Sequence, residues 1–150
     1  MILDNRARYL QLAFNYDGGL VKRILSTIQA SPRILIEAGT PYIKREGMGG
    51  IRMMRALWKG WIVADMKVAD GAVGEVNMVA AAGANAITAL GTSPTETLNL
   101  FVTACRQRNL ISMIDMLGVD DPLAVMRPLR TPPNSLSCIA AVMKKVRAEK

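Results

Sequence analysis

Short apolar runs alternate with amphipathic segments along most of the chain. Five apolar runs bounded by turn residues predict β-strands, at residues 9–14, 33–37, 61–65, 86–90 and 110–114. Between them, apolar residues spaced three and four apart predict helices that begin near residues 17, 47, 73, 93 and 121. Because single helices separate successive strands, we expect the strands to pair in parallel through right-handed crossovers. The pattern therefore predicts an α/β fold of about five βα units.

Two local signals refine the helix starts. Ser93, Pro94 and Glu96 match a capping box, with Ser93 as the N-cap and Pro94 at the first helical position. Gly39 and Pro41 are turn residues that end the second strand. The helix that follows them is therefore expected only from about residue 47.

The composition indicates one compact domain and excludes several kinds of chemistry. The chain has 150 residues, of which 51% are hydrophobic and 21% are charged. It contains no histidine, which excludes Ser-His-Asp triads, Cys-His dyads and histidine-ligated zinc. The two cysteines, Cys105 and Cys138, lack CxxC spacing and lie in apolar contexts, so we expect buried thiols in a reducing, cytoplasmic compartment.

Neither a membrane nor a nucleic acid is expected as a partner. No signal-peptide pattern follows Met1, and the most apolar stretch, residues 71–90, is interrupted by Glu75, Asn77 and Asn85. The net charge is +7, but residues 127–150 carry six basic and one acidic side chain and therefore most of the excess. Because no basic aromatic face accompanies this charge, it is weak evidence for nucleic-acid binding.

Charged residues that end strands favour a barrel. Glu37, Asp65 and Asp115 each close a predicted strand, and the carboxyl ends of parallel strands form the catalytic face of α/β enzymes. The sequence has neither a GxGxxG motif after its first strand nor a phosphate-binding GxxxxGK[ST] loop, which argues against a nucleotide-binding doubly wound sheet. Eight βα units need about 200 to 250 residues. We therefore expect a partial (β/α)8 TIM barrel over residues 1–133 and a basic helical tail over residues 134–150.

The residue run DMKVAD, at positions 65–70, carries the clearest chemical pattern. Alternation along a strand places Asp65 and Lys67 on the same side, and Asp70 follows on the next loop. A carboxylate beside the ammonium keeps the lysine charged, so that it can stabilise an anion on a substrate; the alternative is a surface salt bridge. Glu37 and Asp65 offer oxygen ligands for Mg²⁺. Glu37 and Asp115 are equally compatible with structural capping or ion pairing.

Two short segments of the sequence resemble those of a known family. IEAGTP at residues 36–41 and IVADMKVAD at residues 62–70 resemble the orotidine 5'-phosphate decarboxylase superfamily, and the resemblance extends from about residue 9 to residue 133. Orotidylate decarboxylases usually continue with Ile-Pro after the last Asp of DxKxxD, whereas this chain continues with Gly71 and Ala72. The resemblance therefore favours the branch of 3-hexulose-6-phosphate synthase and 3-keto-L-gulonate-6-phosphate decarboxylase. It implies a homodimeric (β/α)8 barrel whose active sites are shared across the interface.

The resemblance also implies roles for individual residues. In the sugar-phosphate branch, residues matching Glu37 and Asp65 contact Mg²⁺, and Lys67 would neutralise the same enediolate anion. Asp70 would reach into the partner's site. Asp115 matches a further carboxylate that is expected to bind substrate, as is Asn15, which stands where relatives often have aspartate.

Three functions follow as hypotheses. The first is a Mg²⁺-dependent carbon–carbon lyase of the 3-hexulose-6-phosphate synthase type, acting on ribulose 5-phosphate and formaldehyde through an enediolate. The second is metal-free orotidine 5'-phosphate decarboxylation in pyrimidine biosynthesis. The third is an inactive, truncated barrel that serves as a structural module. Metal dependence separates the first two.

The chain departs from the family pattern after Pro133. Relatives continue into an apolar strand and a His-Arg-rich segment, whereas residues 135–150 have the pattern of a basic amphipathic helix. In a reading frame shifted by one base, residues 136–145 can encode apolar residues followed by His-Arg-Gly-Arg-Asp-Glu-Glu. We therefore hypothesise a one-base frameshift near Asn134 in the gene of a longer enzyme.

Overall fold

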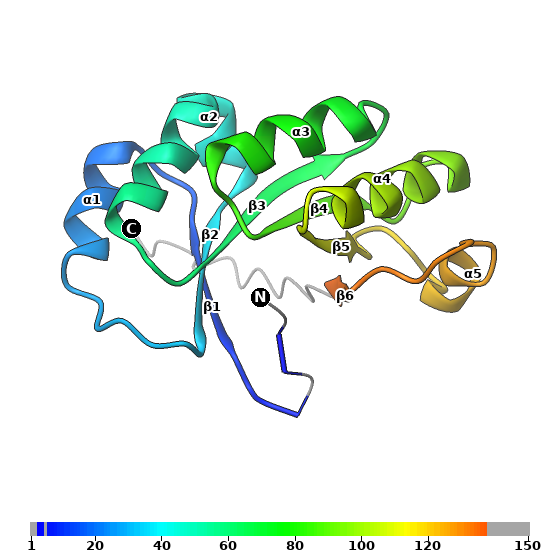
Figure 1. Ribbon diagram of the computed structural model, residues 1–150, viewed down its shortest axis with the longest axis horizontal. Helices are drawn as coiled ribbons and strands as arrows, with labels where there is room; N and C mark the ends of the chain where they lie inside the picture. Colours follow the sequence, from blue (N-terminus) through cyan, green and yellow to red (C-terminus); the bar gives the residue numbers. More distant parts are fainter. Residues whose placement is uncertain (1–2, 5, 138–150) are drawn as a thin grey trace, which may run out of the picture.

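The computed structural model describes residues 3–4 and 6–137. They contain a parallel six-stranded sheet with strand order β1-β2-β3-β4-β5-β6 (Figure 1). The strands are β1 (Leu10–Phe14), β2 (Ile34–Ala38), β3 (Trp61–Val68), β4 (Ala86–Leu90), β5 (Ile111–Asp115) and β6 (Ser135–Ser137). Successive strands are neighbours throughout this sheet, so it lacks the reversal of strand order that defines a doubly wound fold. The predicted partial (β/α)8 barrel is confirmed, with one more strand than the five predicted.

The helices cover one face of the sheet, as they do on the outside of a barrel (Figure 1). They are α1 (Gly18–Leu25), α2 (Thr40–Leu57), α3 (Ala72–Ala82), α4 (Thr95–Gln107) and α5 (Pro122–Met126). The main core lies between this face and the sheet, and includes Ile36, Tyr42, Ile62, Ile87 and Phe101. Among the helices of the described segments, none combines the length and apolarity needed to cross a bilayer.

The opposite face of the sheet, which we call the inner face, carries a second apolar cluster. It consists of Leu35, Trp61, Val63, Ala86, Ile111 and Met113, with Leu3 and Tyr9 packed against it. Strand register explains the cluster, because Leu35 is paired with Trp61 and Val63 with Ala86, so their side chains share one face. The inner face is therefore apolar toward the strand starts, and the polar residues described below lie toward the strand ends.

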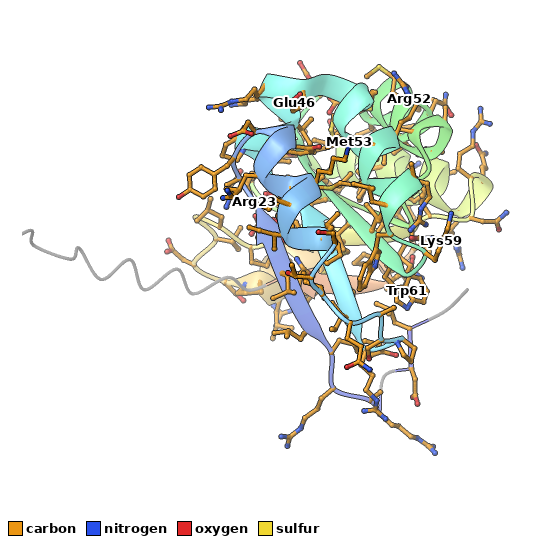
Figure 2. All side chains as sticks on the ribbon, turned by 90° about the vertical axis from the view of Figure 1, so that its left-hand side faces the viewer. Arg23, Glu46, Arg52, Met53, Lys59 and Trp61 are labelled. Atoms are coloured by element: carbon orange, nitrogen blue, oxygen red, sulfur yellow. The ribbon has the colours of Figure 1, made fainter. Side chains whose placement is uncertain are left out.

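The outer helices α1 and α2 pack against each other beside β1 (Figure 2). The Asp17 side chain caps α1 by accepting a hydrogen bond from the Leu20 amide, as its position before the apolar face predicts. The Glu46 carboxylate on α2 accepts a second α1 hydrogen bond, from the Gly18 amide at 3.0 Å. Met53 lies close to Gly18, where an added Cβ would come within 3.1 Å of the methionine methyl. This contact keeps the two helices close together.

Two predicted helix starts are wrong. α2 begins at Thr40, with Pro41 in its first turn, because the missing proline N–H is not needed there. Its predicted start coincides instead with a kink at Gly47, whose φ is +59°. α4 begins at Thr95 without a side-chain cap, because the Ser93 hydroxyl donates to the Val68 carbonyl at 3.2 Å. A tertiary hydrogen bond thus replaces the predicted capping box.

The helix predicted over residues 134–150 is wrong at its start, because Ser135–Ser137 forms β6 parallel to β5. The cause lies in the preceding residue. The Asn134 side-chain oxygen accepts hydrogen bonds from the amide and the hydroxyl of Ser112, both at 3.0 Å, and the Asn134 amide donates to that hydroxyl at 3.1 Å. Residues 138–150, including Cys138, lie outside the described residues, so the predictions for them and for a frameshift stay predictions.

Arg55, which is partly buried, stabilises the fold away from the strand ends. Arg55 donates to the carbonyls of Trp58 and Gly60, each at 2.5 Å, and to the Asn85 side chain at 3.2 Å. These bonds join the end of α2 to the segments that lead into β3 and β4.

Cys105 is fully buried, and this burial raises the pKa of its thiol to about 12, so the predicted buried thiol is confirmed at this position.

Candidate active site

Polar side chains from four neighbouring strands meet near the carboxyl ends of the sheet. Glu37 comes from β2, Asp65 from β3, Thr88 from β4 and Asp115 from β5, and each is less than a tenth exposed. Carboxylates are rarely this buried unless they are paired or hydrogen-bonded. The grouping therefore needs specific partners, and the chain supplies them.

Lys67 joins two of these carboxylates. Its ammonium contacts Asp115 Oδ2 and lies 3.2 Å from Asp65 Oδ1. Burial alone would lower the pKa of Lys67, but the hydrogen bond to Asp115 and the charge of Asp65 outweigh it, so that pKa is raised. The lysine remains charged, and its side chain is about a quarter exposed. The predicted Asp65–Lys67 pair is present, and Asp115 joins it.

A bulge in β3, rather than regular alternation, produces this pair. Ala64 is paired with Ile87, but the next pair joins Val68 to Ala89, so β3 has extra residues between them. Within the bulge, Lys67 has a φ of +51°, in the left-handed region. The prediction that Asp65 and Lys67 share a side holds, but the regular strand geometry used to derive it does not.

Two threonine hydroxyls orient Asp65. Thr40, at the start of α2, contacts Asp65 Oδ2 at 2.8 Å, and Thr88 donates to Asp65 Oδ1 at the same distance. The Thr40 hydroxyl also lies 2.7 Å from the Asp65 carbonyl. The single Thr40 proton is shared between the Asp65 carbonyl and Oδ2, whereas the Thr88 proton goes to Oδ1, so contacts on both sides hold the carboxylate in one orientation. Fixed orientation of a charged group is what an electrostatic catalyst requires.

Glu37 accepts a hydrogen bond from the Gln11 side chain on β1. Burial raises the pKa of Glu37, the Gln11 hydrogen bond opposes this, and the negative charge of Asp65 adds to the rise. The surroundings of Glu37 thus make its ionisation difficult. A nearby cation would favour its charged form.

Replacing Glu37 by glutamine should stabilise the metal-free protein by about 1 kcal/mol near neutral pH. The folded-state pKa of Glu37 lies above its ordinary value of 4.5, so its contribution is complete below that value and is lost as pH rises through the folded-state pKa. Glu37→Gln removes this loss. Urea unfolding in EDTA between pH 4.5 and pH 8 measures it, and an unchanged pH slope in the variant would contradict the expectation.

The residues present fit a Mg²⁺ ion. In the described part of the chain, no three His, Cys, Asp or Glu side chains form a metal-binding group. Mg²⁺ does not need one, because it keeps several waters and commonly binds one or two carboxylates together with substrate oxygens. Glu37 and Asp65 supply such oxygens, and a cation beside them would relieve the difficulty of ionising Glu37. The donor set therefore suits Mg²⁺ completed by water and substrate.

Asn15 and Asp70 lie around this group rather than within it. The Asn15 side-chain oxygen lies over Gly39, where an added Cβ would come within 2.0 Å of it, so only glycine leaves it this room. Asp70 is exposed on the loop after β3. Burial, and then the negative charge of Asp70, raise the pKa of Glu75 in the first turn of α3. Within residues 6–137, no hydrogen bond or ion pair links Asp70 to Lys67.

Sequence reasoning missed Gln11, Thr40 and Thr88. Thr40 lies in the IEAGTP run that carried the family resemblance, but in that run only Glu37 was predicted to have a functional role. Thr88 is the one polar residue in the buried strand AITAL, and a polar residue in an otherwise apolar strand was an available signal. Gln11 had no signal beyond its place in an alternating strand.

A protein family and several curated proteins are similar to this chain in sequence. A family model described as "Orotidine 5'-phosphate decarboxylase / HUMPS family" matches residues 9–146. Among curated proteins, the bifunctional enzyme Fae/Hps of Methanospirillum hungatei is 35% identical over 89% of this chain, and that of Methanothrix thermoacetophila is 37% identical over 89%. The chain covers 35% of the length of each, or about a third.

Solved structures agree with the sequence matches. The 3-hexulose-6-phosphate synthase of Salmonella typhimurium is 28% identical with a TM-score of 0.75, and the alignment covers 81% of this chain and 58% of the synthase. The 3-keto-L-gulonate-6-phosphate decarboxylase of Vibrio cholerae is 25% identical with a TM-score of 0.68, over 72% of this chain and 51% of that protein. The chain thus matches somewhat more than half of each of these barrels.

Proposed function

This chain belongs to the orotidine 5'-phosphate decarboxylase / HUMPS family, and from that premise we propose that it is a carbon–carbon lyase of a phosphorylated sugar, of the 3-hexulose-6-phosphate synthase type. The reaction joins formaldehyde to ribulose 5-phosphate or reverses that step. The relatives found in sequence and in structure carry this activity in their names. The ammonium of Lys67 between Asp65 and Asp115 is the observation that supports the proposal most directly.

The arrangement suits a reaction that passes through an anion. Cleavage of the carbon–carbon bond leaves the electron pair on the sugar as an enediolate, the same anion attacks formaldehyde in the reverse direction, and a fixed ammonium beside its oxygens stabilises it. Lys67 donates hydrogen bonds to those oxygens, while Asp65 and Asp115 keep the lysine charged. The ammonium needs no reorganisation during the reaction, because the Asp65 orientation is already fixed by Thr40 and Thr88.

Glu37 and Asp65 would hold Mg²⁺. Bound there, Mg²⁺ acts as a Lewis acid that polarises substrate oxygens. Below the group, the apolar inner face, with Trp61 and Val63, limits water behind the substrate. As the resemblance implies, Asn15 and Asp115 would contribute hydrogen bonds to the sugar.

We also propose a cytoplasmic homodimer in which Asp70 contributes to the site of the partner subunit. Asp70 is exposed and has no described bond to its own cluster. The helix that follows it, α3, exposes Val73 and Met78 by about half, and its outward face carries no charged side chain except the half-buried Glu75. An apolar face on a surface helix is typical of an interface.

The proposed function is tested by formaldehyde consumption with ribulose 5-phosphate. We expect consumption that requires both the sugar phosphate and Mg²⁺ and that EDTA stops, because Glu37 and Asp65 then lose their cation. Orotidine 5'-monophosphate serves as the alternative substrate. Decarboxylation of this nucleotide that persists in EDTA would favour the second hypothesis, and inactivity toward both would favour an inactive structural module.

A further inference from the structure

The hydroxyl of Thr88 forms hydrogen bonds with both Lys67 and Asp65. It accepts a hydrogen bond from the Lys67 backbone N–H at 3.0 Å and lies 2.8 Å from Asp65 Oδ1, to which it donates. A threonine hydroxyl has one proton and two lone pairs, so it can make both bonds at once. Thr88 is 4% exposed, so no water competes freely for either bond.

Lys67 needs this acceptor because of its backbone conformation. A φ of +51° is costly for a residue with a Cβ, and such a conformation persists only when its surroundings determine it. Inside the bulge, the regular ladder between Ala64 and Val68 is interrupted. The Thr88 hydroxyl takes the place of a ladder carbonyl as the partner of the Lys67 N–H.

The position of Thr88 makes its hydroxyl a fixed point. Thr88 lies in the middle of β4 and is paired with Met113 on β5, and its two chain neighbours, Ile87 and Ala89, are paired with β3 on either side of the bulge. A β-branched side chain has few χ1 rotamers in such a place. The hydroxyl therefore has a defined direction, toward the bulge of β3.

We propose that Thr88 is a positioning residue that sets the place of the Lys67 ammonium relative to Asp65. Through one hydroxyl it fixes the backbone of the lysine and the carboxylate of the aspartate, so that the ammonium projects between Asp65 and Asp115. Thr88 itself touches no substrate. The kinetic part of this inference rests on the proposed function, whereas its geometric part does not.

A simpler account is that Thr88 only satisfies buried hydrogen bonds and contributes stability. On that account, Thr88→Val would lower the melting temperature and leave turnover of the folded protein unchanged. Thr103→Val is a control for the loss of a threonine hydroxyl away from the site, because Thr103 is an exposed residue whose hydroxyl bonds the Asn99 carbonyl within α4. The two accounts differ in turnover and in the conformation of Lys67.

The test compares Thr88→Val, Thr88→Ser and Thr103→Val in the Mg²⁺-loaded protein. We expect Thr88→Val to lower kcat about 10- to 100-fold with a smaller change in KM, because the transition-state contact is misplaced. Thr88→Ser, which keeps the hydroxyl, should recover kcat to within about threefold, and Thr103→Val should match the parent. An unchanged kcat in Thr88→Val, or a serine variant no better than the valine variant, overturns the proposal.

Crystal structures of the same variants give a readout that needs no activity. We expect Lys67 to leave the left-handed region in Thr88→Val and to keep it in Thr88→Ser. A Lys67 φ that stays near +51° in Thr88→Val overturns the proposal even if the parent shows no lyase activity, which would by itself count only against the proposed function. If Thr88→Val does not fold, Thr88→Cys carries the same comparison, because a thiol is a weak donor and a weak acceptor.

Discussion

Replacing Lys67 by methionine should lower kcat of the proposed lyase by about 10²- to 10³-fold, because it removes a fixed charge at the place where an anion develops. The change also leaves Asp115, which is 1% exposed, without its cation. Breaking one half of such a buried pair costs about 3 kcal/mol of unfolding free energy. Urea unfolding and steady-state rates measured on the same preparation separate the two effects.

The chain offers a matched control for this variant. Arg130 forms an ion pair with Glu96 at 3.0 Å, and both side chains are more than half exposed. Arg130→Met should therefore change the unfolding free energy by less than about 1 kcal/mol and leave kcat unchanged. If Lys67→Met is as stable as Arg130→Met, the cation is not needed by its buried partners.

The pH dependence gives an independent check on Lys67. Its folded-state pKa lies above 10.5, the ordinary value, so its charge contributes fully below pH 10.5 and the contribution is lost as the pH rises through the raised value. The parent should lose this part of its stability above pH 10.5, and Lys67→Met should not.

A mixture of two inactive variants should regain activity if the sites are shared between protomers. Lys67→Met and Asp70→Asn damage different contributions, so a mixed dimer holds one site with neither lesion. With random pairing of subunits, about half of the dimers are mixed and each mixed dimer has one intact site of two, so about a quarter of the parent activity should return. The measurement is formaldehyde consumption after the two proteins are mixed, unfolded and refolded together.

Asp65 supplies the control for this experiment. Asp65 and Lys67 come from the same protomer and contact each other at 3.2 Å. Mixing Asp65→Asn with Lys67→Met should therefore restore nothing, because every site keeps one lesion. Recovery in this control, or its absence with Asp70→Asn, would contradict a site completed by the partner subunit.

The sequence was informative about the charged residues because they interrupt apolar strands. Glu37, Asp65 and Asp115 end apolar runs in the sequence, and parallel pairing brings the ends of such runs to one edge. Five strands, their order of pairing and the place of these carboxylates could therefore be predicted. The contact of Lys67 with Asp115 could not, since it joins β3 to β5 across an intervening strand.

The remaining differences arise where a distant side chain overrides a local preference. Lys67 adopts a left-handed conformation that its residue type disfavours, and its partners Thr88 and Asp115 lie on other strands. β6 forms beside β5 because Asn134 is bonded to Ser112, although its own residues suggest a helix. Periodicity reports the burial of a segment, but it does not report such bonds between segments.

The hydrogen bonds of Arg55 lie at the end of the sheet where substitutions are expected to affect stability rather than activity. Arg55 binds the segments that enter β3 and β4, at the opposite end of the sheet from Lys67. Random substitutions around Arg55 should therefore change melting temperature without altering substrate preference. Substitutions in the loops that leave the strands should do the reverse, so a directed-evolution library aimed at new aldehyde acceptors can leave the Arg55 end untouched.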